Sequence, residues 1–255
     1  MQSQVVFLML MRLFTRDMPK IFIVDKKASW LHRFIGWVLR FPWYPKSWQI
    51  NPYYMTSYWT TLGFEIAYPH TDNMAVVYDE WPILCHERVH VGQAKRITRF
   101  LFGSLYLLGT PVYFAVFSLL GLLLLPLWLH IDMWWIVLIF IGTGALFSIP
   151  YPFAYFRARF ELEAYTVSMA IVYWKTGRIA DGYIKSLTSH FTGSSYFYMW
   201  PVKKTVRKWL VRAKKDIKNG TIFTKKYRNH GYHKFLYTTL QKWGIIKKMY
   251  KDLDI

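Results

Sequence analysis

The chain has 255 residues, a formal net charge of +19 and an aromatic content of 20%. This length suits one substantial domain with attached segments, and the positive charge combined with many aromatic residues favours a membrane surface or a polyanion as a partner. A single cysteine, Cys85, excludes an intrachain disulfide, and we expect it to be a small buried side chain.

The first fifty residues are predicted to form an N-terminal extension. The apolar run 5–11 has no basic region before it and no small-residue cleavage site after it, which argues against a secretory signal. Residues 21–24 predict a short strand. Residues 29–43 mix apolar and basic positions at helical spacing behind a serine N-cap. They form either a helix in a membrane interface, with tryptophans at headgroup level, or an amphipathic helix packed on the domain.

Two strands are predicted next, at 60–68 and 74–78, with turn residues between them at 69–73. The edge of a sheet placed just ahead of the next segment could bind an extended peptide by strand addition.

Residues 86–90 read His-Glu-Arg-Val-His in a segment with helix-start signals at 80–82 and no further proline up to 100. His86 and His90 lie one helical turn apart, so both rings can reach one cation. Glu87 is then free to take a proton from a metal-bound water. The pattern indicates a catalytic zinc site, and the alternative is a surface helix with incidental histidines.

A catalytic zinc needs a third protein ligand, and the predicted helical segment 156–165 offers Glu161 and Glu163. These two residues lie on roughly opposite faces of a helix, so only one of them can bind the metal. The other is expected to pair with Arg159 within the helix. Arg157 either orients Glu161 or is a solvated charge.

The pattern H-E-x-x-H-x-x-Q, followed by E-x-x-A-Y, resembles the gluzincin class of zinc metallopeptidases, including the membrane-bound HtpX and CAAX-prenyl protease group, and is similar to small bacterial and phage metallopeptidases. The resemblance covers about residues 60–201. It implies an α+β, mainly helical, zincin-like catalytic core with a small sheet, zinc held by His86, His90 and Glu161, Glu87 as the general base, and a peptide or protein substrate. Its spacing favours Glu161, with Glu163 kept as the alternative.

One position departs from the gluzincin pattern. Members of that class usually carry Asp or Asn where this chain has Tyr165, at a position that orients a histidine ligand. The side chains that could contact and orient the metal ligands are Gln93, Arg157 and Tyr165.

Two uncharged tracts, 101–129 and 133–156, each exceed the roughly 20 residues that cross a bilayer. The three residues between them predict an antiparallel transmembrane hairpin at 101–155, and the alternative is a buried hairpin in a soluble domain. Lys and Arg flank both outer ends and are missing from the turn. By the positive-inside rule, the protein is an integral membrane protein whose metal site faces the cytoplasm.

We expect the helix that carries Glu161 and Glu163 to continue to residue 175, and a short helix to follow at 181–190. An oxyanion in a zinc peptidase needs a hydrogen-bond donor. The candidates are His190, Tyr196 and Tyr198, and core or interfacial packing is the alternative for each of them.

Residues 203–255 carry 16 Lys or Arg and 3 Asp, interleaved with aromatic residues. This region favours anionic lipid over nucleic acid as a partner. The predicted organisation is an extension at 1–50, a catalytic domain at 51–100 plus 155–201, the hairpin at 101–155 and a basic aromatic region at 202–255. The competing function is a non-catalytic membrane-anchored protein that binds lipid or nucleic acid and has a structural or vestigial metal site. The oligomeric state stays open.

Overall fold

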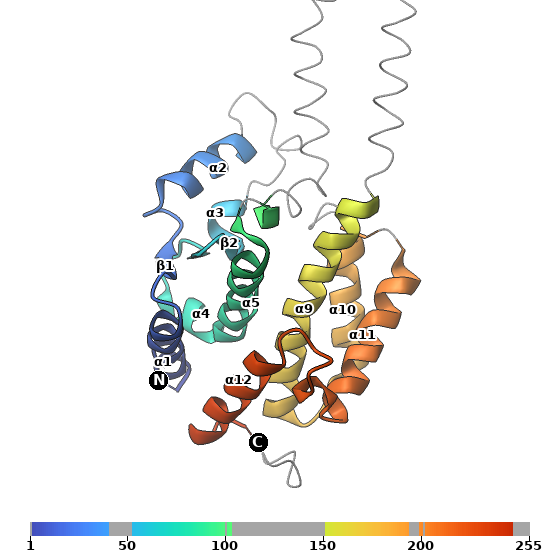
Figure 1. Ribbon diagram of the computed structural model, residues 1–255. Helices are drawn as coiled ribbons and strands as arrows, with labels where there is room; N and C mark the ends of the chain where they lie inside the picture. Colours follow the sequence, from blue (N-terminus) through green and yellow to red (C-terminus); the bar gives the residue numbers. More distant parts are fainter. Residues whose placement is uncertain are drawn as a thin grey trace, which may run out of the picture.

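The computed structural model describes residues 2–40, 53–99, 101–103, 151–193, 199–200 and 202–246. Figure 1 shows helices around a small sheet, which confirms the mainly helical α+β class. In chain order the elements are α1 (Gln2–Asp17), β1 (Phe22–Asp25), α2 (Trp30–Arg40), α3 (Tyr54–Ser57), β2 (Thr60–Leu62), β3 (Glu65–Tyr68), α4 (Met74–Asp79), α5 (Trp81–Ile97), α9 (Tyr151–Thr176), α10 (Asp181–Thr192), α11 (Lys203–Lys218), η3 (Thr221–Phe223) and α12 (His230–Lys242).

The sheet has the strand order β1-β3-β2, with β1 parallel and β2 antiparallel to β3. The predicted single strand at 60–68 is a hairpin, because the chain reverses at Gly63, whose φ of 65° suits glycine in a tight two-residue turn. Among the described residues, β2 pairs with β3 alone, so its other side is an edge of the sheet.

The predicted strand at 74–78 is wrong, since these residues form helix α4. The side chain of Asn73 accepts a hydrogen bond of 3.1 Å from the backbone amide of Ala75 and caps this helix. Val77 is fully buried. A short capped helix with one buried side chain therefore stands where a strand was predicted.

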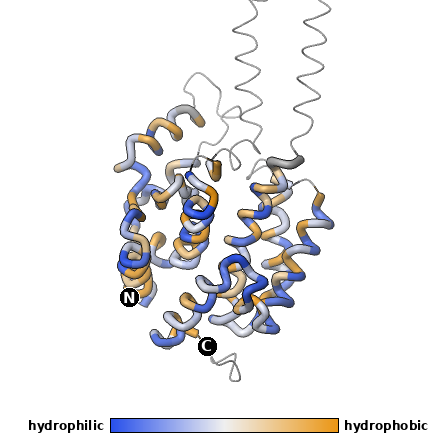
Figure 2. The backbone as a smooth tube through the Cα atoms, viewed as in Figure 1, coloured by the Kyte–Doolittle hydropathy of each residue, from blue (hydrophilic) through white to orange (hydrophobic). Residues whose placement is uncertain are grey.

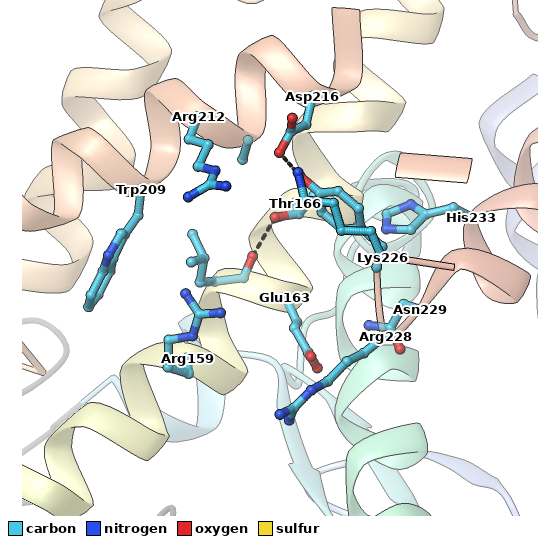
Figure 3. A pocket seen from close by; sticks show the side chains of 13 residues that line it. Arg159, Glu163, Thr166, Trp209, Arg212, Asp216, Lys226, Arg228, Asn229 and His233 are labelled. Carbon is cyan, nitrogen blue, oxygen red and sulfur yellow. Dashed lines mark hydrogen bonds between the residues drawn. The ribbon is translucent and has the colours of Figure 1, made fainter. Parts of the chain in front are cut away.

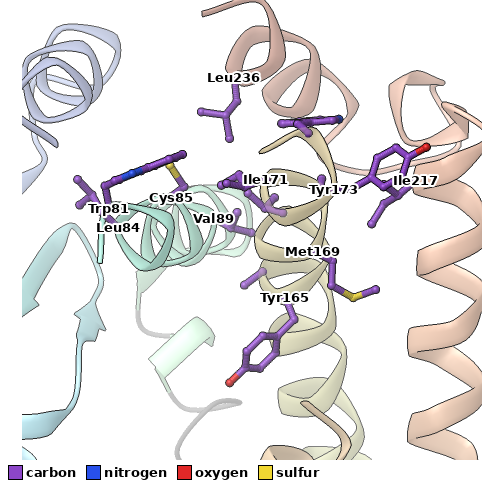
Figure 4. Close-up of a cluster of buried hydrophobic side chains, with 14 of the residues drawn as sticks. Trp81, Leu84, Cys85, Val89, Tyr165, Met169, Ile171, Tyr173, Ile217 and Leu236 are labelled. Atoms are coloured by element: carbon purple, nitrogen blue, oxygen red, sulfur yellow. The ribbon is translucent and has the colours of Figure 1, made fainter. Parts of the chain in front are cut away.

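Helices α5 and α9 pack side by side at the centre of the molecule. Cys85 and Val89 from α5 meet Ile171 from α9 in a cluster of buried side chains that also includes Leu236 from α12 (Figure 4). The same core includes Phe7 of α1, so the first and last described helices share it. The burial of Cys85 agrees with the sequence-based expectation.

Helix α11 packs on α9 and α10 through an apolar stripe at Val206, Leu210, Ala213 and Ile217, all of which are buried. Apolar and hydrophilic positions alternate along the helices in Figure 2. The basic C-terminal region thus has an inward face that belongs to the common core.

Within the described residues, no helix combines the length and the hydrophobicity needed to span a bilayer. Most of the predicted hairpin, residues 104–150, lies outside the described residues. The last turn of α5 and the first turn of α9 lie at the same end of the molecule (Figure 1). The described chain therefore leaves and re-enters the domain at one end.

Candidate metal centre

Three buried side chains from two helices meet between α5 and α9. His86 and His90 lie one turn apart on α5, and their Nε2 atoms are 3.3 Å apart. Glu161 on α9 places its carboxylate oxygens 3.3 Å from His86 Nε2 and 3.6 Å from His90 Nε2. The exposed fractions are 7%, 3% and 1%, in the same order. The interpretation of this segment as a surface helix with incidental histidines is therefore wrong.

These distances suit a single cation. Nitrogen or oxygen donors about 2.0–2.1 Å from a tetrahedral zinc lie roughly 3.4 Å from one another. The three donor atoms all lie within 4.8 Å of one another, and each residue offers one of them. The group His86, His90 and Glu161 could therefore hold a metal ion.

The local electrostatics favour a positive charge at this place. Burial acts to lower the pKa of His86, but the hydrogen bond to Glu161 and the negative charges of Glu161 and Glu87 outweigh it, so the pKa is raised. The same field would attract a divalent cation.

Gln93 fixes the orientation of His90. Its Nε2 donates to the backbone oxygen of Phe160 at 3.0 Å and to a carboxylate oxygen of Glu163 at 2.9 Å. The remaining Oε1 lies 2.8 Å from His90 Nδ1 and can only accept, so His90 carries its proton on Nδ1. The Nε2 lone pair of His90 then faces the cluster, as a metal ligand requires.

Ser168 occupies the equivalent place behind His86. Its hydroxyl lies 3.3 Å from His86 Nδ1. The residues that contact the outer nitrogens of both rings are thus Gln93 and Ser168, and neither role depends on an Asp or Asn at the position of Tyr165.

Glu163 points away from the three candidate ligands. Besides receiving Gln93, its carboxylate pairs with Arg96 of α5 at 3.0 Å. The expected pairing within the helix between Glu163 and Arg159 is wrong. Arg159 instead lies over the ring of Trp209, with the guanidinium carbon 5.9 Å from the ring centroid.

Glu87 lies on the side of the sheet. The hydroxyl of Thr61 on edge strand β2 donates to Glu87 Oε2 at 2.6 Å. Lys26 is fully buried and donates to the backbone oxygen of Tyr54 at 2.7 Å. Burial lowers the pKa of Lys26 to about 7, and the negative charge of Glu87 opposes this shift. A buried carboxylate next to His86 in the sequence is thus held by a strand hydroxyl.

Two more of the sequence-predicted residues lie close by. The ring of Tyr165 packs edge to face on His86, with centroids 4.6 Å apart. Its hydroxyl lies 3.5 Å from Nδ1 of His190. Burial lowers the pKa of His190, against the charge of Glu161. Tyr196 and Tyr198 lie outside the described residues.

Arg157 is only 4% exposed, so its interpretation as a solvated charge is wrong. Sequence reasoning missed Thr61, Ser168 and Lys26. Ser168 had a signal, because it follows Glu161 by seven residues and therefore shares its helix face. Thr61 and Lys26 had none, since their positions depend on how the sheet packs against α5.

Comparison of the chain with protein-family models, with curated proteins and with solved structures finds no match.

Proposed function

We propose that this chain is a membrane-anchored, zinc-dependent metallopeptidase. The observation that carries the proposal is the convergence of His86, His90 and Glu161 from two helices at 3.3–3.6 Å, with Glu87 beside them on α5. Two imidazoles and one carboxylate are a ligand set typical of catalytic zinc, which needs a fourth position for water. The metal, when bound, lowers the pKa of that water and polarises the scissile carbonyl.

The protein groups then divide the proton transfers. Glu87 accepts a proton from the attacking water and delivers it to the leaving amine nitrogen, while the Thr61 hydroxyl holds its carboxylate in place. Tyr165 and His190 lie on the α9 and α10 side of the site, where a donor could stabilise the oxyanion.

A peptide is the substrate class that the neighbouring strand supports. Edge strand β2 contacts α5 and carries Thr61, the residue that binds Glu87. An extended peptide that paired with the outer side of β2 would pass next to Glu87. Backbone pairing of this kind depends little on the side chains of the peptide, so we expect only a weak preference for particular substrate sequences.

Three observations support membrane anchoring. The sequence places two uncharged tracts between α5 and α9, and both helices meet that gap at the same end of the domain. Helix α2 packs on Met55 of α3 through Gly36, where a Cβ would lie 2.7 Å from the methionine sulfur. Its other face exposes Trp30, Phe34 and Trp37, by 71%, 54% and 51%. Such a face suits the headgroup region of a bilayer, which supports an interfacial role for α2.

The competing proposal is a non-catalytic membrane protein with a structural metal and a basic surface for lipid or nucleic acid. The outward Lys and Arg residues of α11 favour it. It predicts metal without turnover, so the two proposals separate in one experiment.

Glu87→Gln tests the enzyme proposal. The variant should keep stoichiometric zinc, measured by mass spectrometry, and lose at least about 100-fold in kcat on a peptide library, because a general base contributes about 10²–10⁴-fold. The matched control is Asp79→Asn, which removes an exposed acid outside the site and should cleave as the wild type does.

Equal rates for wild type and Glu87→Gln would refute the assigned mechanism. Bound zinc with no chelator-sensitive cleavage in the wild type would instead favour the structural metal.

A further inference from the structure

A polar cavity of about 350 Å³ lies beside α9, apart from the three candidate metal ligands. Helices α9 and α11, the segment that follows η3, and α12 form its walls (Figure 3). None of its lining residues is one of the three candidate metal ligands. Its volume lies at the small end of the range of about 300–1,000 Å³ that is usual for ligand pockets.

Four cations surround this cavity. Arg159 comes from α9, Arg212 from α11, and Lys226 and Arg228 from the segment before α12 (Figure 3). Within the part of the chain that the structure describes, none of them forms an ion pair with a carboxylate. Arg159 is positioned by the ring of Trp209. Positive charge converging on a concave wall attracts an anion.

The two acidic residues of the cavity each have a hydrogen-bond partner, and two carboxylates stand against four cations. Glu163 pairs with Arg96 and receives Gln93. Asp216 accepts a hydrogen bond from the hydroxyl of Tyr227. They therefore offset the four cations only in part, and the cavity keeps a net positive charge.

The inner wall carries two buried nitrogen atoms that have no hydrogen-bond partner among the described residues, Asn229 Nδ2 and His233 Nδ1. His233 is 1% exposed. A buried polar atom without a partner costs about 1–3 kcal/mol, which a bound acceptor would recover. The lining of the cavity thus combines four cations with two unsatisfied polar atoms.

We propose that this cavity binds a phosphate monoester. Guanidinium groups bind phosphate oxygens in pairs, and three arginines from three different segments face one small space. The amide nitrogen of Asn229 donates to an oxygen at the inner wall. The phosphate belongs either to a small soluble metabolite or to a lipid headgroup. The site is separate from the candidate metal centre, and its occupation does not depend on peptidase activity.

Isothermal titration calorimetry on the full-length protein in detergent tests the proposal. The probes are glycerol 3-phosphate, as a soluble monoester, and dihexanoyl phosphatidic acid, as a lipid with the same group. Dihexanoyl phosphatidylcholine, which has no monoester, is the probe control. The wild type should bind at least one of the first two probes and not the third. Binding of the soluble probe assigns a metabolite, and binding of the lipid alone assigns a headgroup.

Two variants localise the binding. The double variant Arg159→Gln, Arg212→Gln should weaken it by at least about tenfold, since a charge-assisted hydrogen bond contributes about 1.5–3 kcal/mol. Asn229→Asp keeps all four cations and should weaken it by a similar factor. The matched control is Lys204→Gln, Lys208→Gln, which removes two exposed charges from α11 outside the cavity and should bind as the wild type does.

Circular dichroism confirms that each variant is folded. Single-stranded DNA serves as a further probe. The proposal is overturned if the wild type binds neither monoester, if cavity and control variants lose affinity equally, or if DNA is the only probe that binds.

Discussion

Glu161 and Glu163 are two positions apart and face different partners. Glu161 lies against both imidazoles, while Glu163 lies against Arg96 and Gln93. Since Gln93 also orients His90, Glu163 supports the candidate metal centre from a distance. The two carboxylates should therefore differ sharply in what their removal does.

Replacing each glutamate with glutamine separates these roles. Glu161→Gln should weaken zinc binding by more than about 100-fold, because it removes the charged ligand, whereas Glu163→Gln should cost about tenfold or less, below the 10–100-fold usual for groups that contact a ligand directly. Competition with a chromophoric chelator measures both affinities. The opposite order would make Glu163 the third ligand.

Spacing within one helix was enough to predict His86, Glu87 and His90, because a helix fixes which positions share a face. The choice of Glu161 came from the resemblance and fits the observed distances. Thr61 and Lys26 could not be predicted, since their contacts depend on how the sheet packs against α5. Helix spacing therefore identified residues within one helix. Residues that other segments bring to the site came from the resemblance, as Glu161 did, or were missed, as Thr61 and Lys26 were.

Among the elements, helix α2 has two faces with different partners. Gly36 allows close contact with Met55, and His32 is buried on the same side between the hydroxyl of Tyr54 at 2.6 Å and the carboxylate of Glu65 at 3.4 Å. The opposite face exposes large aromatic residues. The sequence left the choice between a packed and an interfacial helix open because both need an apolar stripe. In the structure, α2 has apolar residues on two faces, one packed on α3 and one exposed.

Contact between α2 and a bilayer can be tested in proteoliposomes. A polarity-sensitive fluorophore on Phe34→Cys should be quenched by lipids that carry a quencher, because this side chain is exposed on the apolar face. The control is the same fluorophore on Lys185→Cys, an exposed position of α10, which should stay unquenched. Equal quenching at both positions would argue against an interfacial helix.

The error at residues 74–78 has a local cause. The apolar residues that follow the turn at 69–73 suggested a strand, but Asn73 caps a helix there, and the cap favours a helix in so short a segment. In α5, by contrast, the start signals at 80–82 and the absence of proline up to residue 100 predicted a helix correctly.

At the scale of the whole molecule, two buried histidines link stability to pH. Burial and the charge of Lys26 lower the pKa of His32 to about 4, and burial and the charge of His230 lower the pKa of His233 to about 3. Above these pKa values both rings are neutral in the folded state, whereas the histidines of the unfolded chain take up protons near their ordinary pKa of 6.5. The unfolded state thus binds more protons below that pH, and stability falls as the pH drops toward 4 and 3.

His233→Leu tests this linkage. In chelator, so that metal release does not contribute, the wild type should lose on the order of 3–5 kcal/mol per histidine across this pH range. The variant should lose less, and His230→Gln, which removes a charge that lowers the pKa of His233, should fall between His233→Leu and the wild type. Urea unfolding at several pH values measures the slope. The same slope in His233→Leu and wild type would exclude His233 as the source.

The charge of residues 203–255 suggested a surface region, yet Leu210 and Ile217 of α11 are buried in the core that also holds Phe7 of α1. A high net charge describes the outer face of a helix. It does not reveal whether the same helix also has an apolar stripe, with residues every three or four positions, that packs in the core. Contacts between such distant segments have no signature in composition.

The three candidate ligands come from helices that are far apart in the sequence and adjacent in space. A cation bound by all of them would tie the two halves of the chain together in the manner of a cross-link, closing a loop of more than seventy residues. With one buried cysteine, this protein has no intrachain disulfide to serve that purpose. Metal supply would then govern how long each molecule survives as well as whether the proposed peptidase activity is present.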